Sequence, residues 1–279
     1  MSENCNHDCA HCAQKCDDKK PESFLVAPHP QSRIKRVIGV MSGKGGVGKS
    51  FVTALLASEM TRRGHQTGVL DADITGPSIP KMFGIKTRAE GDENGIYPVP
   101  SDSGIDVMSL NLLLEKETDP VIWRGSLITG TVLQFWKDVI WKDEDYLFVD
   151  MPPGTGDVTL TVFQSLPLSG IVVVGTPQGL VNMIVSKAVK MARMMNVPLL
   201  GYVENMSYLK CPECGHDTAL FGPSRADAVA EEFGFPCAVR LPLDPVRAAA
   251  CDEGRVECIR EEALEPLLKR LESLPEKTK

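Results

Sequence analysis

Short apolar runs alternate with amphipathic stretches along the chain from Arg33 onward. The runs expected to form strands lie at 37–41, 67–71, 105–110, 145–150, 171–175, 199–204 and 237–241. Helical periodicity falls between and after them, at 52–63, 126–140, 179–196, 223–233 and 259–274. Residues 171–174 are apolar throughout, as a strand covered on both faces must be. This alternation predicts an α/β fold with a doubly wound, mostly parallel sheet, whose ligands bind at the carboxyl ends of the strands.

The amino-terminal region has a different character. Residues 1–32 are polar, contain three prolines and four cysteines, and show almost no apolar periodicity. We therefore predict a flexible, cysteine-rich tail and linker over 1–32, followed by the main domain over 33–279. Within that domain, residues 84–104 are rich in Gly, Asp, Asn and Pro and are expected to form a long excursion or a hairpin.

Composition narrows the class of protein. The chain has 279 residues, of which 43% are hydrophobic, and a formal net charge of -7. A large core is expected, whereas a surface built to bind nucleic acid or an anionic membrane is not. No apolar run approaches the roughly 20 residues that span a bilayer, and the first residues lack the pattern of a secretory signal. We therefore expect a soluble, cytoplasmic protein.

Residues 43–50 read G-K-G-G-V-G-K-S, directly after the first predicted strand and directly before a helix. Backbone N–H groups of such a loop point at phosphate oxygens, and the helix dipole favours the anion. Gly43 and Gly48 permit the tight backbone path, Lys49 is placed to reach the β- and γ-phosphates, and Ser50 to ligate Mg²⁺. The sequence thus predicts that ATP and Mg²⁺ bind to Gly43, Lys44, Gly45, Gly46, Val47, Gly48, Lys49, Ser50 and Phe51.

Acidic residues follow two of the predicted strands. Asp73 comes after the strand at 67–71, and Asp150 ends the strand at 145–150. Because parallel strands end at the same edge of a sheet, both carboxylates are expected beside the phosphate loop. Asp150 is suited to hold the Mg²⁺ shell, and Asp73 to orient or deprotonate the attacking water.

Lys44 narrows the class further, because a plain phosphate loop has no requirement for charge at this position. The loop resembles the deviant Walker A motif of the superfamily of MinD, ParA and the nitrogenase iron protein. In that superfamily, the early lysine crosses a dimer interface to the partner's phosphates. The resemblance implies a homodimeric ATP hydrolase of slow turnover, in which Lys44 acts as an arginine finger does.

The chain resembles one branch of that superfamily, the Mrp/ApbC family of iron–sulfur cluster carrier ATPases, over nearly all of residues 30–275. The strings that carry the resemblance are D-A-D-I-T-G-P-S at 71–78, V-I-W-R-G at 121–125, D-M-P-P-G-T-G-D at 150–157, T-P-Q at 176–178 and E-N-M-S-Y at 204–208. By this analogy, Asn205 would contact the adenine edge, with Pro242 and Asp244 closing over the base. The sequence assigns no role to Trp123 or Arg124.

Cys211 and Cys214 form a C-x-x-C knuckle that offers two thiolates. Structural zinc and 4Fe–4S clusters each require four ligands, so a partner copy of the chain could supply the other two across a twofold axis. The residues alone leave zinc and a cluster open. The resemblance implies a labile 4Fe–4S cluster that bridges the two subunits, with zinc as the main alternative.

The amino-terminal cysteines are spaced C-x-x-x-C-x-x-C-x-x-x-C. Four thiols in one flexible strip can hold a cluster or a zinc ion without help from a partner, or can remain an unliganded, thiol-rich tail; these residues are Cys5, Cys9, Cys12 and Cys16. The remaining cysteines, Cys237, Cys251 and Cys258, have no partner spacing and are expected to be buried as small apolar residues.

The leading hypothesis is an ATP-dependent carrier that receives a 4Fe–4S cluster from an assembly scaffold at its dimer interface and transfers it to apo-proteins. One alternative is a positioning ATPase of the ParA or MinD kind, with the knuckle stabilised by zinc. The other is an electron donor like the nitrogenase iron protein, although the cluster cysteines of that protein lie far apart in sequence.

Overall fold

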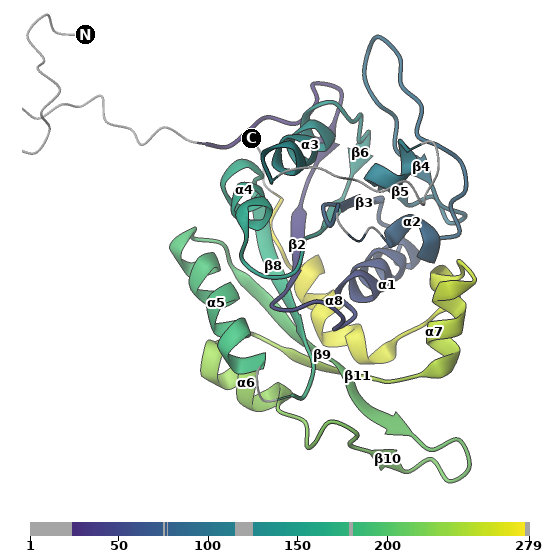
Figure 1. The fold of residues 1–279 in the computed structure, drawn as a ribbon, viewed down its shortest axis with the longest axis vertical. Helices are drawn as coiled ribbons and strands as arrows, with labels where there is room; N and C mark the ends of the chain where they lie inside the picture. Colours follow the sequence, from purple (N-terminus) through teal and green to yellow (C-terminus); the bar gives the residue numbers. More distant parts are fainter. Residues whose placement is uncertain (1–23, 75, 77, 115–124, 179–180, 277–279) are drawn as a thin grey trace, which may run out of the picture.

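The structure is a computed structural model that describes residues 24–74, 76, 78–114, 125–178 and 181–276. Its main sheet has the strand order β10-β9-β8-β2-β7-β3-β5-β4, with β11 beside β9 (Figure 1). Seven of these strands run parallel: β2 (Val37–Ser42), β3 (Thr67–Asp71), β5 (Asp106–Met108), β7 (Tyr146–Asp150), β8 (Leu168–Gly175), β9 (Leu199–Lys210) and β11 (Ala238–Pro242). Two short strands at the edges are antiparallel: β4 (Val99–Pro100) and β10 (Asp217–Thr218).

Helices cover both faces of the sheet, as the sequence predicts for a doubly wound fold (Figure 1). One face packs against α1 (Lys49–Arg62), α2 (Ile79–Met82), α7 (Pro245–Asp252) and α8 (Glu265–Glu272). The other face packs against α3 (Gly125–Lys137), α4 (Asp157–Ser165), α5 (Val181–Met194) and α6 (Ala226–Phe233). Side chains along each strand alternate between the two cores: Ile38 and Val40 of β2 face the first, Val37 and Met41 the second.

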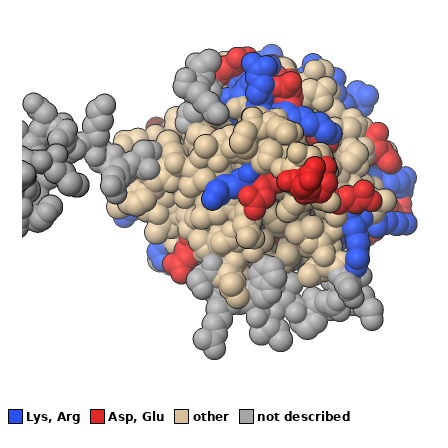
Figure 2. Space-filling model, turned by 90° about the horizontal axis from the view of Figure 1, so that it is seen from above, with Lys and Arg blue, Asp and Glu red and all other residues tan. Residues whose placement is uncertain are grey.

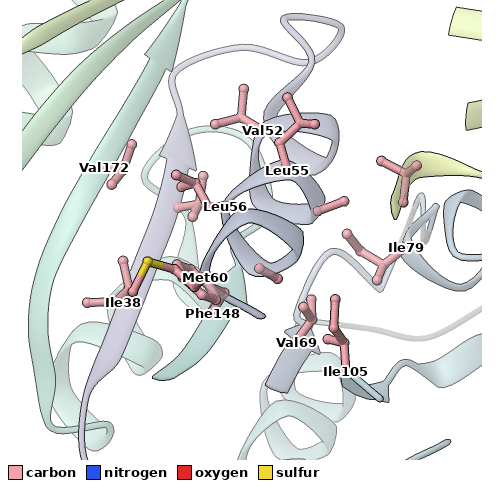
Figure 3. Packing of buried hydrophobic residues seen from close by; sticks show 14 of the residues in the cluster. Ile38, Val52, Leu55, Leu56, Met60, Val69, Ile79, Ile105, Phe148 and Val172 are labelled. Atoms are coloured by element: carbon pink, nitrogen blue, oxygen red, sulfur yellow. The ribbon is translucent and has the colours of Figure 1, made fainter. Parts of the chain in front are cut away.

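Helix α1 is anchored on the sheet by an almost continuous buried face. Val52, Leu55, Leu56 and Met60 are fully buried against strand residues such as Ile38 (Figure 3). Burial of each such side chain contributes about 1.5–3 kcal/mol to the free energy of folding. Because β2 is also buried along its length, the loop that joins β2 to α1 is fixed at both ends.

Some predicted elements differ from those observed. The region predicted as one helix at 259–274 contains a 3₁₀ turn, η3 (Glu262–Leu264), followed by the shorter helix α8; another 3₁₀ turn, η2 (Val256–Cys258), precedes it. Pro266 lacks a backbone N–H, so a regular helix can contain it only in the first turn, which is where α8 begins. Strand β9 continues six residues beyond the predicted end at 204, because its distal part pairs with β10.

The excursion at 84–104 closes the opposite edge of the sheet. Ile96 bridges both Gly91 and Val139, and β4 then runs antiparallel to β5. A third 3₁₀ turn, η1 (Leu110–Leu112), follows β5. The region is therefore a hairpin-like extension that returns to the sheet.

Residues 24–32, which the sequence assigns to the linker, are held against the domain. The Val26 N–H donates to the Ser165 carbonyl at 2.8 Å, and the Trp136 indole N–H donates to the Val26 carbonyl at 2.8 Å. The next residues form β1 (Arg33–Ile34), which pairs with β6 (Asp143–Glu144). The four amino-terminal cysteines, together with Trp123 and Arg124, lie outside the described residues.

Surface charge is mixed on the face drawn in Figure 2, where basic and acidic side chains lie side by side around uncharged areas. Within the described residues, every helix is too short or too polar to cross a membrane.

Candidate functional site

The glycine-rich loop lies at the carboxyl end of β2 and runs into α1. Gly46 and Gly48 adopt left-handed conformations, with φ of 76° and 82°. A Cβ on Gly48 would stand 2.1 Å from Nδ2 of Asn205, so both backbone conformation and space require glycine there. The loop therefore holds the strand-to-helix turn that the sequence predicts for a phosphate cradle.

Lys49 and Asp150 form a buried ion pair beneath the loop, with 2.8 Å between Nζ and Oδ2. The Ser50 hydroxyl donates to the same carboxylate oxygen at 2.6 Å. Thr53, one turn further along α1, donates to the other oxygen at 2.8 Å. The structure thus brings together Lys49, Ser50 and Asp150 as the sequence predicts, and adds Thr53. The sequence could have indicated Thr53, because it lies four residues after Lys49 and residues four apart on a helix share a face.

Asp73 approaches the same cluster from the end of β3. Its Oδ2 lies 3.6 Å from the Lys49 ammonium, so Lys49 lies between two carboxylates. This position beside the cradle is compatible with the predicted role in orienting water, which stays a prediction.

Asp71 is a buried carboxyl that the sequence analysis did not assign. It lies opposite Asp150 in the register of β3 and β7, and it accepts a hydrogen bond from the Ser109 hydroxyl at 3.0 Å. Burial, and next the negative charge of Asp150, raise the pKa of Asp71 to about 8. The chain therefore holds this group as a neutral carboxylic acid at neutral pH. The spacing of Asp71 and Asp73, two apart at a strand end, was the available signal.

Lys44 lies apart from this cluster. Its ammonium donates to Oε1 of Gln178, which follows β8 in the T-P-Q string. Lys44 is half-buried and Gln178 is exposed. Within one chain, the two lysines of the loop therefore have different partners: Lys49 has the carboxylates of Asp150 and Asp73, and Lys44 has an exposed amide.

Asn205 supports the loop from β9. Its Nδ2 donates to the Val47 carbonyl at 2.9 Å, and the side chain is buried. Phe51, in the first turn of α1, is partly buried and packs against the hydrophobic core. The predicted contact of Asn205 with the adenine edge stays a prediction, but the position next to the loop suits it.

Pro242 is the last residue of β11, and Asp244 lies two residues beyond it. Pro242 pairs with Tyr208 of β9, and the Leu243 N–H donates to the Tyr208 carbonyl at 2.7 Å. Asp244 caps α7 by accepting a hydrogen bond from the Val246 N–H at 2.8 Å. Of the three residues predicted to surround the base, Asn205 and Pro242 thus lie on the neighbouring strands β9 and β11, and Asp244 lies between β11 and α7.

The cysteine knuckle begins where β9 ends. The Gly215 N–H donates to the Cys211 carbonyl, and the Cys211 N–H donates to the His216 carbonyl, each at 2.9 Å. Backbone N–H groups of Cys214 and Glu213, together with the Cys214 side chain, hydrogen-bond to the Cys211 thiol and lower its pKa. Such a turn, with N–H groups directed at a sulfur, suits a thiolate that ligates a metal centre.

Cys214 is exposed and Cys211 is half-buried, so the pair is open to solvent. Among the residues that the structure describes, no third His, Cys, Asp or Glu joins the two in a metal-binding group. The knuckle of one chain offers two ligands.

The isolated cysteines behave differently from one another. Cys237 and Cys251 pack against the core, and burial raises the pKa of both thiols, to about 11 for Cys251. Cys258 is exposed, so its predicted burial is wrong. It ends the 3₁₀ turn η2, in which Val256 takes the buried position and Cys258 faces solvent.

The loop, its supporting carboxylates and the parallel sheet define the P-loop NTPase fold. The solved cell-division ATPase MinD of Pyrococcus furiosus has the same fold, with a TM-score of 0.58 at 20% sequence identity over 85% of this chain and 97% of that one. At that identity, the likeness concerns the fold alone.

Within this fold class, the chain belongs to the ParA family of NUBPL iron-transfer P-loop NTPases, whose model matches residues 33–278. It is 45% identical to the iron–sulfur cluster carrier protein of Clostridium perfringens, over 89% of this chain and 93% of the relative. It is 40% identical to the protein of the same name from Methanocaldococcus jannaschii, over 96% of each chain.

A solved relative is closer in structure than MinD. The nucleotide-binding protein of Archaeoglobus fulgidus in complex with ADP has 43% identity and a TM-score of 0.75, over 83% of this chain and 91% of that one.

Proposed function

We propose that this protein is a cytoplasmic, ATP-dependent iron–sulfur cluster carrier. Two copies of the chain hold a 4Fe–4S cluster between their Cys211 and Cys214 pairs, receive it from an assembly scaffold and transfer it to apo-proteins. The observation that carries the proposal is the preorganised thiol pair at the end of β9, in a chain whose relatives are named iron–sulfur cluster carrier proteins.

The number of thiolate ligands that a cluster requires supports a dimer. A 4Fe–4S cluster takes four thiolates, and one knuckle supplies two of them. A twofold axis brings the same patch of each copy face to face, so a second knuckle would complete the set. The exposure of Cys214 leaves the pair accessible to a partner copy.

The loop side of the molecule suits ATP hydrolysis. Bound ATP and Mg²⁺ supply the phosphoryl group and the charge that neutralises it; Lys49 and Ser50 would hold them, with Asp150 in the Mg²⁺ shell. Asp73 would orient the attacking water. Lys44, whose ammonium lies outside the buried cluster and donates to the exposed Gln178, would reach the phosphates bound to the partner copy. The solved relative bound to ADP supports nucleotide binding at this loop.

The decisive experiment is anaerobic iron–sulfur reconstitution of the full-length chain, followed by iron and sulfide analysis and visible absorption. To isolate the central site, all samples carry serine substitutions at Cys5, Cys9, Cys12 and Cys16. We expect about four iron atoms per dimer and broad thiolate-to-iron absorption, both lost in Cys211→Ser/Cys214→Ser. Cys258→Ser, an exposed cysteine outside the knuckle, is the matched control and should keep the cluster.

The proposal fails if iron binding survives the loss of both knuckle cysteines, or if the purified protein holds zinc alone at this site. Transfer is tested separately, by following activation of an apo-ferredoxin mixed with the reconstituted dimer. A cluster that stays on the dimer and cycles reversibly between two oxidation states would favour electron donation instead.

A further inference from the structure

One strand connects the glycine loop to the cysteine knuckle. Asn205 of β9 contacts the loop through Val47, and Cys211 directly follows the last residue of the same strand. At about 3.3 Å per residue, the six steps between them span about 20 Å. No other strand in the described part of the chain touches the loop and also leads directly into the knuckle.

Strand β9 is irregular directly after Asn205. Glu204 pairs with Arg240 of β11, and Tyr208 pairs with Pro242. Residues 205–207 of β9 therefore lie opposite Leu241 alone, which makes a bulge in β9. At its centre, Met206 has a φ of 55°, in the left-handed region that a residue with a side chain rarely adopts.

Polar contacts fix the two sides of this bulge. Glu204 is fully buried, and its carboxylate accepts hydrogen bonds from the Ser207 hydroxyl at 2.7 Å and from the Arg225 N–H at 2.9 Å. Nε of Arg240 donates to the Ser207 hydroxyl at 3.1 Å, and the guanidinium lies 5.5 Å from the centre of the Tyr208 ring. Arg240 thus contacts both the bulge and the strand segment that leads to Cys211.

We propose that the bulge at 205–207 is the joint that couples nucleotide binding to the metal affinity of the cysteine knuckle, with Met206 and Arg240 as its positioning residues. The inference rests on the function proposed above and adds the route within one chain. A change in the loop moves Asn205; the constrained backbone at Met206 and the contacts of Arg240 transmit that movement to Tyr208 and on to Cys211. Bulges beside functional sites re-aim the strand that follows them, and a local backbone constraint persists only where the surrounding structure holds it.

The test measures Co²⁺ affinity at the knuckle with and without saturating ADP, from the thiolate-to-cobalt absorption. Excess Mg²⁺ is present throughout, so that Co²⁺ does not report the nucleotide site. The full-length chain again carries serine at the four amino-terminal cysteine positions. We expect ADP to change the Co²⁺ dissociation constant by at least about fivefold, and Co²⁺ to change the ADP dissociation constant by the same factor, because coupling is reciprocal.

Two variants probe the joint without touching loop or thiol. Met206→Gly makes the bulge compliant, since glycine adopts this φ without strain, and Arg240→Ala removes the contacts to Ser207 and Tyr208. We expect the effect of ADP on Co²⁺ affinity to fall below about twofold in each, while ADP still binds and Co²⁺ still gives its thiolate band. Arg240→Lys, which can still donate to Ser207, should restore part of the coupling.

Asn196→Gly is the matched control. Asn196 is an exposed residue that also has a positive φ, of 54°, and it lies ahead of β9 and away from the bulge. It should retain full coupling. Equal coupling in wild type, Met206→Gly and Arg240→Ala overturns the inference, as does a wild-type chain in which ADP and Co²⁺ bind independently. Either result leaves the carrier function standing, whereas absence of Co²⁺ or ADP binding in the wild type removes both.

Discussion

The glycine loop and the cysteine knuckle differ in how far one chain completes them. Around the loop, Lys49 and Asp150 are buried and paired, and Ser50 and Thr53 satisfy the carboxylate. At the knuckle, backbone N–H groups and the Cys214 side chain hydrogen-bond to the Cys211 thiol and lower its pKa, and Cys214 is exposed. A buried charge requires a partner in the same chain, because burying it unpaired is costly, whereas a solvent-exposed thiol has no such requirement. Within one chain, the charged groups beneath the loop are thus paired and buried, whereas the knuckle offers two thiols that are open to solvent.

The largest expected effect is at the loop. In Gly48→Ala, the Cβ meets the Asn205 amide and the left-handed backbone is strained, so the loop must shift. We expect ADP affinity to fall by about 100-fold, equivalent to about 3 kcal/mol of strain and displacement, measured by calorimetric titration.

Gly45→Ala is the control for this change, because a Cβ there meets nothing within 4 Å. It should lose far less affinity. If the two alanine variants bind ADP equally well, the support of the loop by Asn205 does not matter to nucleotide binding.

The Cys211 thiol of the knuckle should react faster with an alkylating reagent than the Cys251 thiol does. Cys211 has a lowered pKa, whereas burial raises the pKa of Cys251 to about 11. At pH 7.5, we expect metal-free protein to be alkylated by iodoacetamide at Cys211 at least about tenfold faster than at Cys251, because the thiolate is the reacting form. Peptide mass spectrometry gives both rates in one sample. Comparable rates would contradict the idea that the turn prepares a thiolate.

A smaller effect is expected from Asp71, whose raised pKa makes stability depend on pH. Between about pH 4 and 8, the folded chain keeps the proton that the unfolded chain loses, so the free energy of unfolding falls as pH rises. Asp71→Asn, which cannot titrate, should reduce this fall by about 1 kcal/mol per pH unit in that window. Denaturant titrations at pH 5, 6.5 and 8 measure it. Parallel pH profiles for the two proteins would show that Asp71 is ionised when folded.

Local patterns predicted the glycine-rich turn between β2 and α1, because such a turn is fixed by neighbouring residues. The proximity of Lys49, Ser50 and Asp150 followed from the rule that parallel strands end at the same edge of a sheet. The contacts of Thr53 with Asp150, Gln178 with Lys44 and Asn205 with Val47 depend on which strands become neighbours. That order comes from packing across the whole sheet, which no short motif records.

Helix boundaries and lone cysteines were harder for a similar reason. The apolar periodicity begins before residue 265, but Pro266 must lie in the first turn of a helix, so α8 begins at Glu265. Cys258 faces solvent because it lies in a 3₁₀ turn whose buried position is taken by Val256. The bulge in β9 left no signal in the hydrophobic pattern, since an apolar Met206 between polar Asn205 and Ser207 fits the alternation of a regular strand.

The two lysines of the loop differ in the free-energy cost of leaving their partners, Gln178 for Lys44 and Asp150 for Lys49. Removing Lys49 from its site would leave the buried Asp150 carboxylate without this counterion, so the Lys49 ammonium is committed to its own chain. When Lys44 leaves Gln178, it loses only a hydrogen bond to a neutral, solvent-exposed acceptor, and water can take the place of the ammonium at the Gln178 amide. The loop therefore carries one cation that is anchored to its own chain and one that can exchange its hydrogen-bond partner at little cost in free energy.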